Sequence, residues 1–382
     1  MKTGTWLTML VAASLLTGCK GFWQAPGGSS GPTPISTLSS GVFYVANQAT
    51  SQVAAFSIVS GVLTKVSGSP YTLTSAPFAI AIDPSGSFLY VSTAQGIFLY
   101  SIASGGALTL ANNGGVISSD LATTMQVDAT GSWLVEAGPN IAQVMAIPIN
   151  KNTGIPISSI EQQALLPAST IQELTIAPDN AHVFVALGAG GTEEVSFSAG
   201  NSNPFGSEQN FAVKNSAGAA VSVAVDPNNR LVYIGETAAT SGSNSGGLRA
   251  FNYSTMTEIS GSPYASGGLG PYSILPLSNG YLYVANRTVS GSSNGNITGF
   301  SVTTSGSTYS LSPLSTTASA GIQPVGLAVD SQGNYLLAVN FGGNPDLDGY
   351  TLDTTTAGKL DLAVTGATGS DPAQATAIAA LP

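Results

Sequence analysis

The sequence predicts an all-β fold built from seven copies of one four-stranded unit. A motif with a turn between two apolar strands recurs every 45 to 54 residues from Gly41 onward. Turns must be frequent, because 46 Gly and 21 Pro occur among 382 residues. Only 7% of the residues are charged, which excludes coiled coils and long surface helices. Because such a repeat length is typical of propellers or solenoids, four strands per copy favour a seven-bladed β-propeller.

The first forty residues predict an export signal followed by a tether. Lys2 precedes an apolar run from Trp6 to Leu16, which is too short to cross a bilayer. The end of this run, Leu16-Thr17-Gly18-Cys19, resembles a bacterial lipoprotein signal, and the single Cys of the chain lies at the lipidation position. An ordinary secretory signal with a chance Cys is the alternative.

This resemblance implies three regions and a location. We expect a signal peptide at 1–18, a lipidated Cys19 with a flexible tether at 19–40, and the propeller at 41–382. The tether is rich in Gly, Ser and Pro, which cannot bury enough apolar surface to fold. Because no Asp follows Cys19, the resemblance favours lipid anchoring in the outer membrane of a bacterial cell envelope, on the periplasmic or the surface side.

Each copy of the unit begins with a buried strand, a turn and a second strand. In the clearest copy, residues 77–82 alternate larger and smaller apolar side chains. Asp83-Pro84-Ser85-Gly86 fits a type I turn, and residues 88–91 return as a strand rich in aromatic and β-branched side chains. One apolar position of this second strand marks every copy: Tyr44, Tyr90, Val135, Phe184, Tyr233, Tyr283 and Leu337.

The two ends of the repeat array predict how the ring closes. The chain enters at a second strand, residues 42–47, with no first strand before it. Residues 375–381 have the Ala-rich composition of a first strand. We therefore expect the last strand to complete blade one, which would cover an otherwise unpaired sheet edge.

Several of these motifs resemble the YVTN-repeat propellers. The resemblance rests on Tyr44-Val45-Ala46-Asn47, Tyr283-Val284-Ala285-Asn286, the Asp-Pro-Ser-Gly turn and Gly-Ser-Pro-Tyr at 68–71 and 261–264. Such repeats are similar to the lactonase-type seven-bladed proteins related to 6-phosphogluconolactonase and the cycloisomerases. The resemblance covers 41–382 and implies the fold, whereas activity depends on a site that the fold does not fix.

The loop face of the last three blades is the predicted binding side, because its loops at 236–247, 287–296 and 341–349 are long. Three positions past the marker, we expect the rim of the axial cavity to carry a polar arc. The candidate ligand-binding residues are Asn47, Glu236, Asn286 and Asn340, with Arg249 and Arg287 nearby. In the alternative interpretation, these side chains end their strands and bind their own turns.

The favoured function is a binding or assembly module that takes a protein, carbohydrate or small-molecule ligand on the loop face. The alternative is a metal-independent, lactonase-like hydrolase of sugar lactones. In that case Glu236 or Glu136 would activate water, and Arg287 with Arg249 would stabilise an oxyanion. The single histidine, His182, aligns with mid-strand and favours a packing role.

Metal and nucleic-acid functions have little support in the sequence. Asn344, Asp346 and Asp348 resemble the start of a calcium loop, but Thr355 replaces the bidentate Glu, so a solvated acidic turn is favoured. Glu193 and Glu194 are likewise interpreted as a solvated pair. Nine Lys and Arg against nineteen Asp and Glu disfavour phosphate-backbone binding. No cofactor is expected.

Overall fold

The computed structural model describes residues 41–139, 141–353 and 355–382. The predicted signal peptide, Cys19 and the tether lie outside these residues. Within the described part of the chain, no helix has the length and apolar character needed to cross a membrane.

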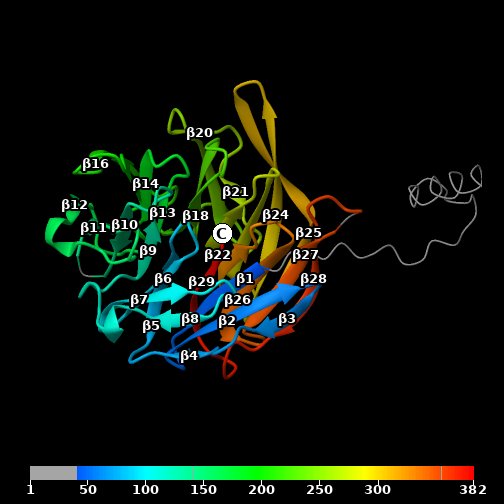
Figure 1. The fold of residues 1–382 in the computed structure, drawn as a ribbon. Coiled ribbons are helices and arrows are strands. Elements are labelled where there is room, and N and C mark those ends of the chain that lie inside the picture. Colours follow the sequence, from blue (N-terminus) through cyan, green and yellow to red (C-terminus); the bar gives the residue numbers. More distant parts are fainter. Residues whose placement is uncertain (1–40, 140, 354) are drawn as a thin grey trace, which may run out of the picture. The chain divides into compact units, whose positions relative to one another are not determined.

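Strands are grouped in sheets around one axis, which confirms the predicted propeller (Figure 1). Blade one pairs strands in the order β29-β1-β2-β3, with the short β4 beside β2. Its strands are β29 (Ala375–Ala380), β1 (Gly41–Asn47), β2 (Gln52–Val59), β3 (Val62–Lys65) and β4 (Tyr71–Thr72). The last strand of the chain therefore completes the first blade, as predicted, by pairing Phe43–Asn47 with Ala375–Ala380.

Blades two to five are separate antiparallel sheets, and the first strand of each lies nearest the axis, where first strands of neighbouring blades contact one another. Blade two contains β5 (Pro77–Ile82), β6 (Phe88–Thr93), β7 (Gly96–Ile102) and β8 (Leu108–Leu110). Blade three contains β9 (Thr124–Val127), β10 (Trp133–Ala137), β11 (Gln143–Pro148) and β12 (Gln162–Leu165). Blade four contains β13 (Glu173–Ile176), β14 (His182–Ala186), β15 (Thr192–Phe197) and β16 (Phe205–Phe211).

Blade five has an additional short strand, and two 3-10 turns lie in the connections of blades two and three. Blade five contains β17 (Ala220–Val225), β18 (Leu231–Glu236), β19 (Gly247–Asn252), β20 (Thr257–Glu258) and β21 (Tyr264–Ala265). The turns are η1 (Asn112–Gly114) and η2 (Ser158–Ile160).

Blades six and seven depart from the prediction of separate four-stranded units. They form one seven-stranded sheet, because β25 (Thr308–Val329) is both the outer strand of blade six and the first strand of blade seven. The other strands are β22 (Leu269–Pro276), β23 (Tyr281–Thr288), β24 (Asn294–Ser305), β26 (Tyr335–Gly343), β27 (Leu347–Leu352) and β28 (Leu360–Gly366). The tip of the β24–β25 hairpin extends away from the blades in Figure 1.

The repeat marker is the buried centre of every second strand. All seven marker residues are at most 1% exposed. Three marker tyrosines also join neighbouring blades, because each hydroxyl donates to a glycine carbonyl of the next blade: Tyr44 to Gly106, Tyr90 to Gly154 and Tyr283 to Gly358. Tyr233 is the exception, since its buried hydroxyl has no partner among the described residues.

The predicted Asp turns are confirmed in their hydrogen bonds. Asp83 Oδ1 accepts the backbone N–H groups of Ser87 and Phe88. Asp128 Oδ1 accepts those of Ser132 and Trp133 in the same way. These bonds satisfy turn donors at the face opposite the long loops and fix the register of the first two strands.

Candidate functional site

A cavity of about 390 Å³ lies on the propeller axis, within the range of small-molecule sites. It is lined by residues of the innermost strands and by Arg287 and Phe341, which lie near the loop-face ends of β23 and β26. The cavity therefore lies at the loop-face end of the axis. The half-buried residues that line it are Phe78, Thr123, Thr124, Gln172, Glu173, Tyr272, Arg287, Val325, Phe341, Thr376, Ala377 and Ile378.

One equivalent position of each innermost strand forms a ring around the axis, which we call the axial ring. In each blade, the ring residue lies on the first strand and pairs with the residue two positions after the marker on the second strand. The seven ring residues are Ala79, Thr124, Glu173, Ser222, Ser273, Gly326 and Ala377. Polar members join neighbouring blades. Thr124 Oγ1 accepts the N–H of Leu174 at 3.0 Å, and Ser273 Oγ accepts the N–H of Leu327 at 3.0 Å.

Glu173 is the one charged residue of the axial ring. Its Oε2 accepts the N–H of Val223 in the next blade at 2.9 Å, so one oxygen is held by the ring. Burial raises the pKa of Glu173 to about 8, although the Val223 hydrogen bond acts in the opposite direction. A carboxyl group with this pKa can both release and accept a proton near neutral pH.

Arg287 is held by aromatic faces at the loop-face end of the cavity. Its guanidinium lies 4.8 Å from the ring centre of Tyr272 and 5.8 Å from that of Phe341. Nη2 donates to Gln323 Oε1 at 3.1 Å, and Gln323 has a φ of 56°, in the left-handed region. Among the described residues, no carboxylate lies within ion-pair distance of Arg287. The cation is therefore positioned but not neutralised.

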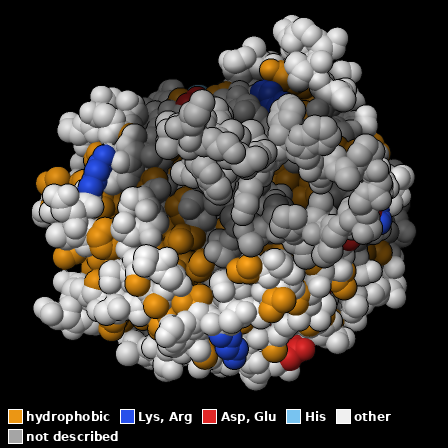
Figure 2. Space-filling model, turned by 45° about the vertical axis from the view of Figure 1, so that its right-hand side comes forward, with side chains coloured by type: hydrophobic (Ala, Val, Ile, Leu, Met, Phe, Trp, Pro, Cys, Tyr) orange, Lys and Arg blue, Asp and Glu red, His pale blue; other side chains and the backbone are white. Residues whose placement is uncertain are grey.

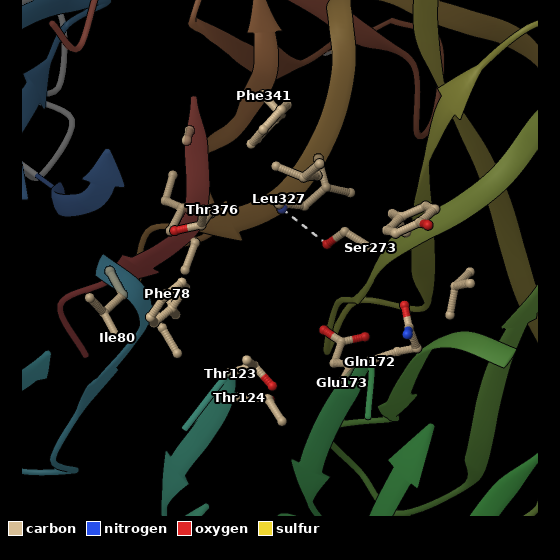
Figure 3. Close-up of a pocket in the computed structure, with 18 of the residues that line it drawn as sticks. Phe78, Ile80, Thr123, Thr124, Gln172, Glu173, Ser273, Leu327, Phe341 and Thr376 are labelled. Atoms are coloured by element: carbon tan, nitrogen blue, oxygen red, sulfur yellow. Dashed lines mark hydrogen bonds between the residues drawn. The ribbon is translucent and has the colours of Figure 1, made fainter. Parts of the chain in front are cut away.

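The cavity has a polar side and an apolar side. Thr123, Thr124, Gln172 and Glu173 come from the neighbouring blades three and four and lie together in Figure 3. Phe341 of blade seven lies across the cavity from them in this view, and Phe78 of blade two lies beside Thr376, between Phe341 and the threonines. The Oγ1 of Thr123 has no hydrogen-bond partner among the described residues, so the polar side includes an unsatisfied group.

The predicted polar arc is not the rim of this cavity. We call its positions, three past the marker, the strand-end belt. Asn47, Asn286 and Asn340 are fully buried and do not line the cavity. Their amides donate to loop carbonyls instead: Asn47 to Thr368, Asn286 to Ser266 and Asn340 to Pro345. The alternative interpretation, in which these residues bind turns and loops, is therefore the better one for their contacts.

Glycine takes the same belt position in blade three for a steric reason. A Cβ on Gly138 would lie 1.8 Å from the carbonyl oxygen of Leu121. The loop that enters the blade thus occupies the space that an asparagine side chain fills elsewhere. The belt is a layer of loop attachment within the blades.

Glu236 and Arg249 form a buried ion pair and do not face the cavity. Arg249 Nη1 donates to Glu236 Oε1 at 2.9 Å, and its Nη2 donates to Glu258 Oε2 at 3.0 Å. Glu236 Oε2 also accepts the N–H of Lys214 at 2.8 Å. Because both oxygens of Glu236 are engaged, the predicted roles of Glu236 and Arg249 in water and oxyanion chemistry do not fit this geometry.

Asp346 and Asp348 are buried, so the interpretation as a solvated turn is wrong. Asp346 accepts the N–H groups of Thr368 and Ala373, and Asp348 accepts the amide of Asn340. The backbone N–H of Asn344 donates to Asp371. Burial raises the pKa of both buried aspartates. The described chain contains no group of three His, Cys, Asp or Glu residues arranged for a metal ion.

Two further sequence interpretations concern blade four. His182 begins β14, and its Nδ1 lies 2.5 Å from Glu194 Oε1 while its ring packs edge-on against Tyr253. This agrees with a packing role. The interpretation of Glu193 and Glu194 as a solvated pair is wrong, because each is 5% exposed. Glu193 accepts a hydrogen bond from Asn210 at 2.8 Å.

Glu173 and the polar side of the cavity were missed by the sequence analysis. A signal was present, since Glu173 occupies a position that is Ala, Thr, Ser or Gly in the other six blades. Arg287 was predicted to bind ligand, and the structure places it at the cavity. It lies four positions past the marker of blade six, and Phe341 occupies the equivalent position in blade seven. The rim is thus one residue further along than predicted.

Comparisons with known proteins agree with this architecture. Residues 28–171 match the family model described as lactonase, 7-bladed beta-propeller. No curated protein matches the chain significantly. A candidate 6-phosphogluconolactonase from Bacteroides fragilis superposes with a TM-score of 0.69 at 15% identity, over 92% of this chain and 100% of its own. The periplasmic gluconolactonase of Pseudomonas aeruginosa gives 0.67 at 14%, over 90% and 99%.

These identities establish the fold alone. The family match covers the first three blades apart from β29, and the structural matches extend over nearly all of the chain. The protein is therefore a seven-bladed β-propeller whose residues 28–171 are similar to the lactonase family of such propellers.

Proposed function

We propose that this protein hydrolyses a lactone in the axial cavity, with Glu173 as the proton-transfer group and Arg287 as the oxyanion-stabilising group. The observation that carries the proposal is that the one acid and the one cation among the described lining residues face the same small cavity. The family similarity and the relatives named as lactonases support lactone chemistry here.

The proposed reaction needs water and no other reactant. Ionised Glu173 accepts a proton from water as the water oxygen bonds to the lactone carbonyl carbon. The carbonyl electron pair moves to its oxygen, where the Arg287 guanidinium stabilises the negative charge. When the carbonyl re-forms, the ring C–O bond breaks and the leaving alkoxide takes the proton from Glu173. The product is a hydroxy acid, and Glu173 is ionised again.

This role predicts the pH dependence of turnover. Because the pKa of Glu173 is raised to about 8, most of the protein carries the neutral acid at pH 7. The reactive ionised form increases as the pH rises through 8. We expect kcat/KM to increase over this interval and then level off.

The decisive variant is Glu173→Gln, assayed by pH-stat titration after subtraction of spontaneous hydrolysis. We expect kcat/KM to fall by about 100-fold or more, because a positioned acid–base group contributes roughly that factor. Glu208→Gln is the matched control, since Glu208 is an exposed glutamate on the outer strand of the same blade. Equal activity of the Glu173 variant and the control would refute the assignment. If wild-type protein binds lactones without turnover, the cavity belongs to a binding module, as the sequence analysis favoured.

We also propose that the protein works in the bacterial envelope, anchored through Cys19. The leader resemblance supports this location, and the Pseudomonas aeruginosa relative is named as periplasmic. Cys19→Ser should move the full-length protein from the membrane fraction to the soluble fraction of expressing cells. Retention of the variant in the detergent fraction would contradict lipid anchoring.

A further inference from the structure

The lining of the axial cavity combines few charged groups with several apolar side chains. A phosphorylated substrate needs several cations or backbone donors to replace the hydration of its charge. Among the described lining residues, Arg287 is the one cation, and one of its donors is already bonded to Gln323. Glu173 faces the same cavity, and the whole chain carries a net charge of −10. Both features disfavour a dianionic ligand.

The walls formed by blades seven, one and two offer apolar contact. Phe78 on β5, Val325 on β25, Phe341 after the belt of blade seven and Ile378 on β29 are half-buried at the cavity, so each keeps surface that a ligand can cover. Figure 3 shows Phe341 across the cavity from Thr123, Thr124, Gln172 and Glu173, with Phe78 beside Thr376 at the flank of this group. A ligand with hydroxyl groups all round would leave part of this wall without matching contacts.

We infer that the preferred substrate is an uncharged lactone with an apolar side chain, whose ring lies toward Glu173 and whose side chain lies against Phe78 and Phe341. This inference rests on the proposed lactone hydrolysis and specifies its substrate class. Each methylene group that the wall removes from water contributes about 0.8 kcal/mol of binding free energy. Two buried methylenes thus correspond to about 10-fold in affinity.

The test compares three lactones on the full chain: δ-decanolactone, D-glucono-δ-lactone and its 6-phosphate. We expect kcat/KM to be at least about 10-fold higher for δ-decanolactone than for either sugar lactone. A preference for either sugar lactone would overturn the inference and leave the proposed hydrolysis intact.

A binding measurement separates the two proposals. Calorimetric titration with δ-decanolactam and glucono-δ-lactam, which resist hydrolysis, reports the preference even if no lactone is turned over. Tighter binding of the alkyl lactam without turnover would support the ligand class and refute the hydrolysis. Tighter binding of the sugar lactam would refute the ligand class.

Phe78→Ser provides the site-specific check. We expect the ratio of decanolactam to gluconolactam affinity to fall about 10-fold, because the variant removes apolar wall. Val62→Ser is the control, since Val62 is an exposed apolar residue on β3 of blade one. An unchanged ratio in a folded Phe78 variant would contradict the placement of the side chain against this wall.

Discussion

Glu236 of the strand-end belt and Glu173 of the axial ring are both glutamates at the loop-face end of a strand, but their surroundings differ. Both oxygens of Glu236 accept hydrogen bonds from Arg249 and from the backbone of Lys214. Glu173 has one oxygen bonded to Val223 and lines a cavity. The first carboxylate attaches a loop, whereas the second is available to a ligand. Position relative to the axis, more than residue type, separates attachment from chemistry.

The surface of the propeller shows why few charges are available for either task. Charged side chains are sparse on the face drawn in Figure 2, where most of the described surface is hydrophobic or uncharged. Several of the charged residues are committed to ion pairs, such as Arg230 with Asp226 and Lys359 with Asp353. Arg287, a cation with no carboxylate partner among the described residues, is therefore a candidate for ligand binding.

The largest effect that would test this comparison is loss of the belt ion pair. Arg249→Ala leaves Glu236 buried without its cation, and we expect the free energy of unfolding to fall by about 3–5 kcal/mol. Urea unfolding monitored by tryptophan fluorescence provides the measurement. Glu173→Gln should lower stability far less, because it removes no ion pair. Equal destabilisation of the two variants would contradict the conclusion that the belt carboxylate is structural whereas the ring carboxylate is available to a ligand.

A smaller effect is expected at Glu136, a buried carboxyl on β10 whose Oε2 has no described partner. Burial, with the neighbouring Asp120 and Glu161, raises the pKa of Glu136 to about 9. In the unfolded chain, Glu136 ionises near pH 4.5. The stabilising contribution of the neutral carboxyl in the folded protein is therefore complete below pH 4.5 and is lost as the pH rises toward 9.

Glu136→Gln should therefore flatten this part of the pH dependence and stabilise the protein at pH 8 by about 1–3 kcal/mol. The measurement is the urea midpoint between pH 5 and 9. Glu208→Gln is the control, because Glu208 is an exposed glutamate in another blade and does not contribute to the raised pKa of Glu136. A variant that is less stable than wild type at pH 8 would show that Glu136 has a stabilising partner in solution.

The smallest effect compares two equivalent marker tyrosines. Tyr90→Phe removes the hydrogen bond to Gly154 and should cost about 1 kcal/mol. Tyr233→Phe removes a buried hydroxyl without a described partner and should be neutral or slightly stabilising. Thermal unfolding of the two variants side by side tests this difference. Equal losses would mean that Tyr233 is hydrogen-bonded in solution.

The repeat made most of the fold predictable. Marker positions, Asp turns and the closing strand 375–380 all follow from local pattern, since alternation and turn chemistry act over a few residues. The shared strand β25 was not predictable in this way. Its residues 308–320 are Ser- and Thr-rich, so they give no apolar alternation to mark where one blade ends and the next begins.

The site was harder to predict, because it depends on contacts between blades about 50 residues apart. Glu173 is held by Val223 of the next blade, and the environment of its carboxyl depends on the whole ring. The belt asparagines were correctly noticed as exceptional, but their buried contacts with Thr368, Ser266 and Pro345 come from loops with no distinctive sequence. Local sequence cannot show on which side of a strand end such a loop will pack.

The sequence by itself determined the number of units, the strand order within most of them and the composition that leaves few charges. Local hydrophobic alternation and turn chemistry suffice for these features. Only the tertiary structure decided which polar groups face the axis. Seven first strands must come together before Glu173 and Arg287 share a cavity, and the closing of that ring raises the pKa of one and positions the other.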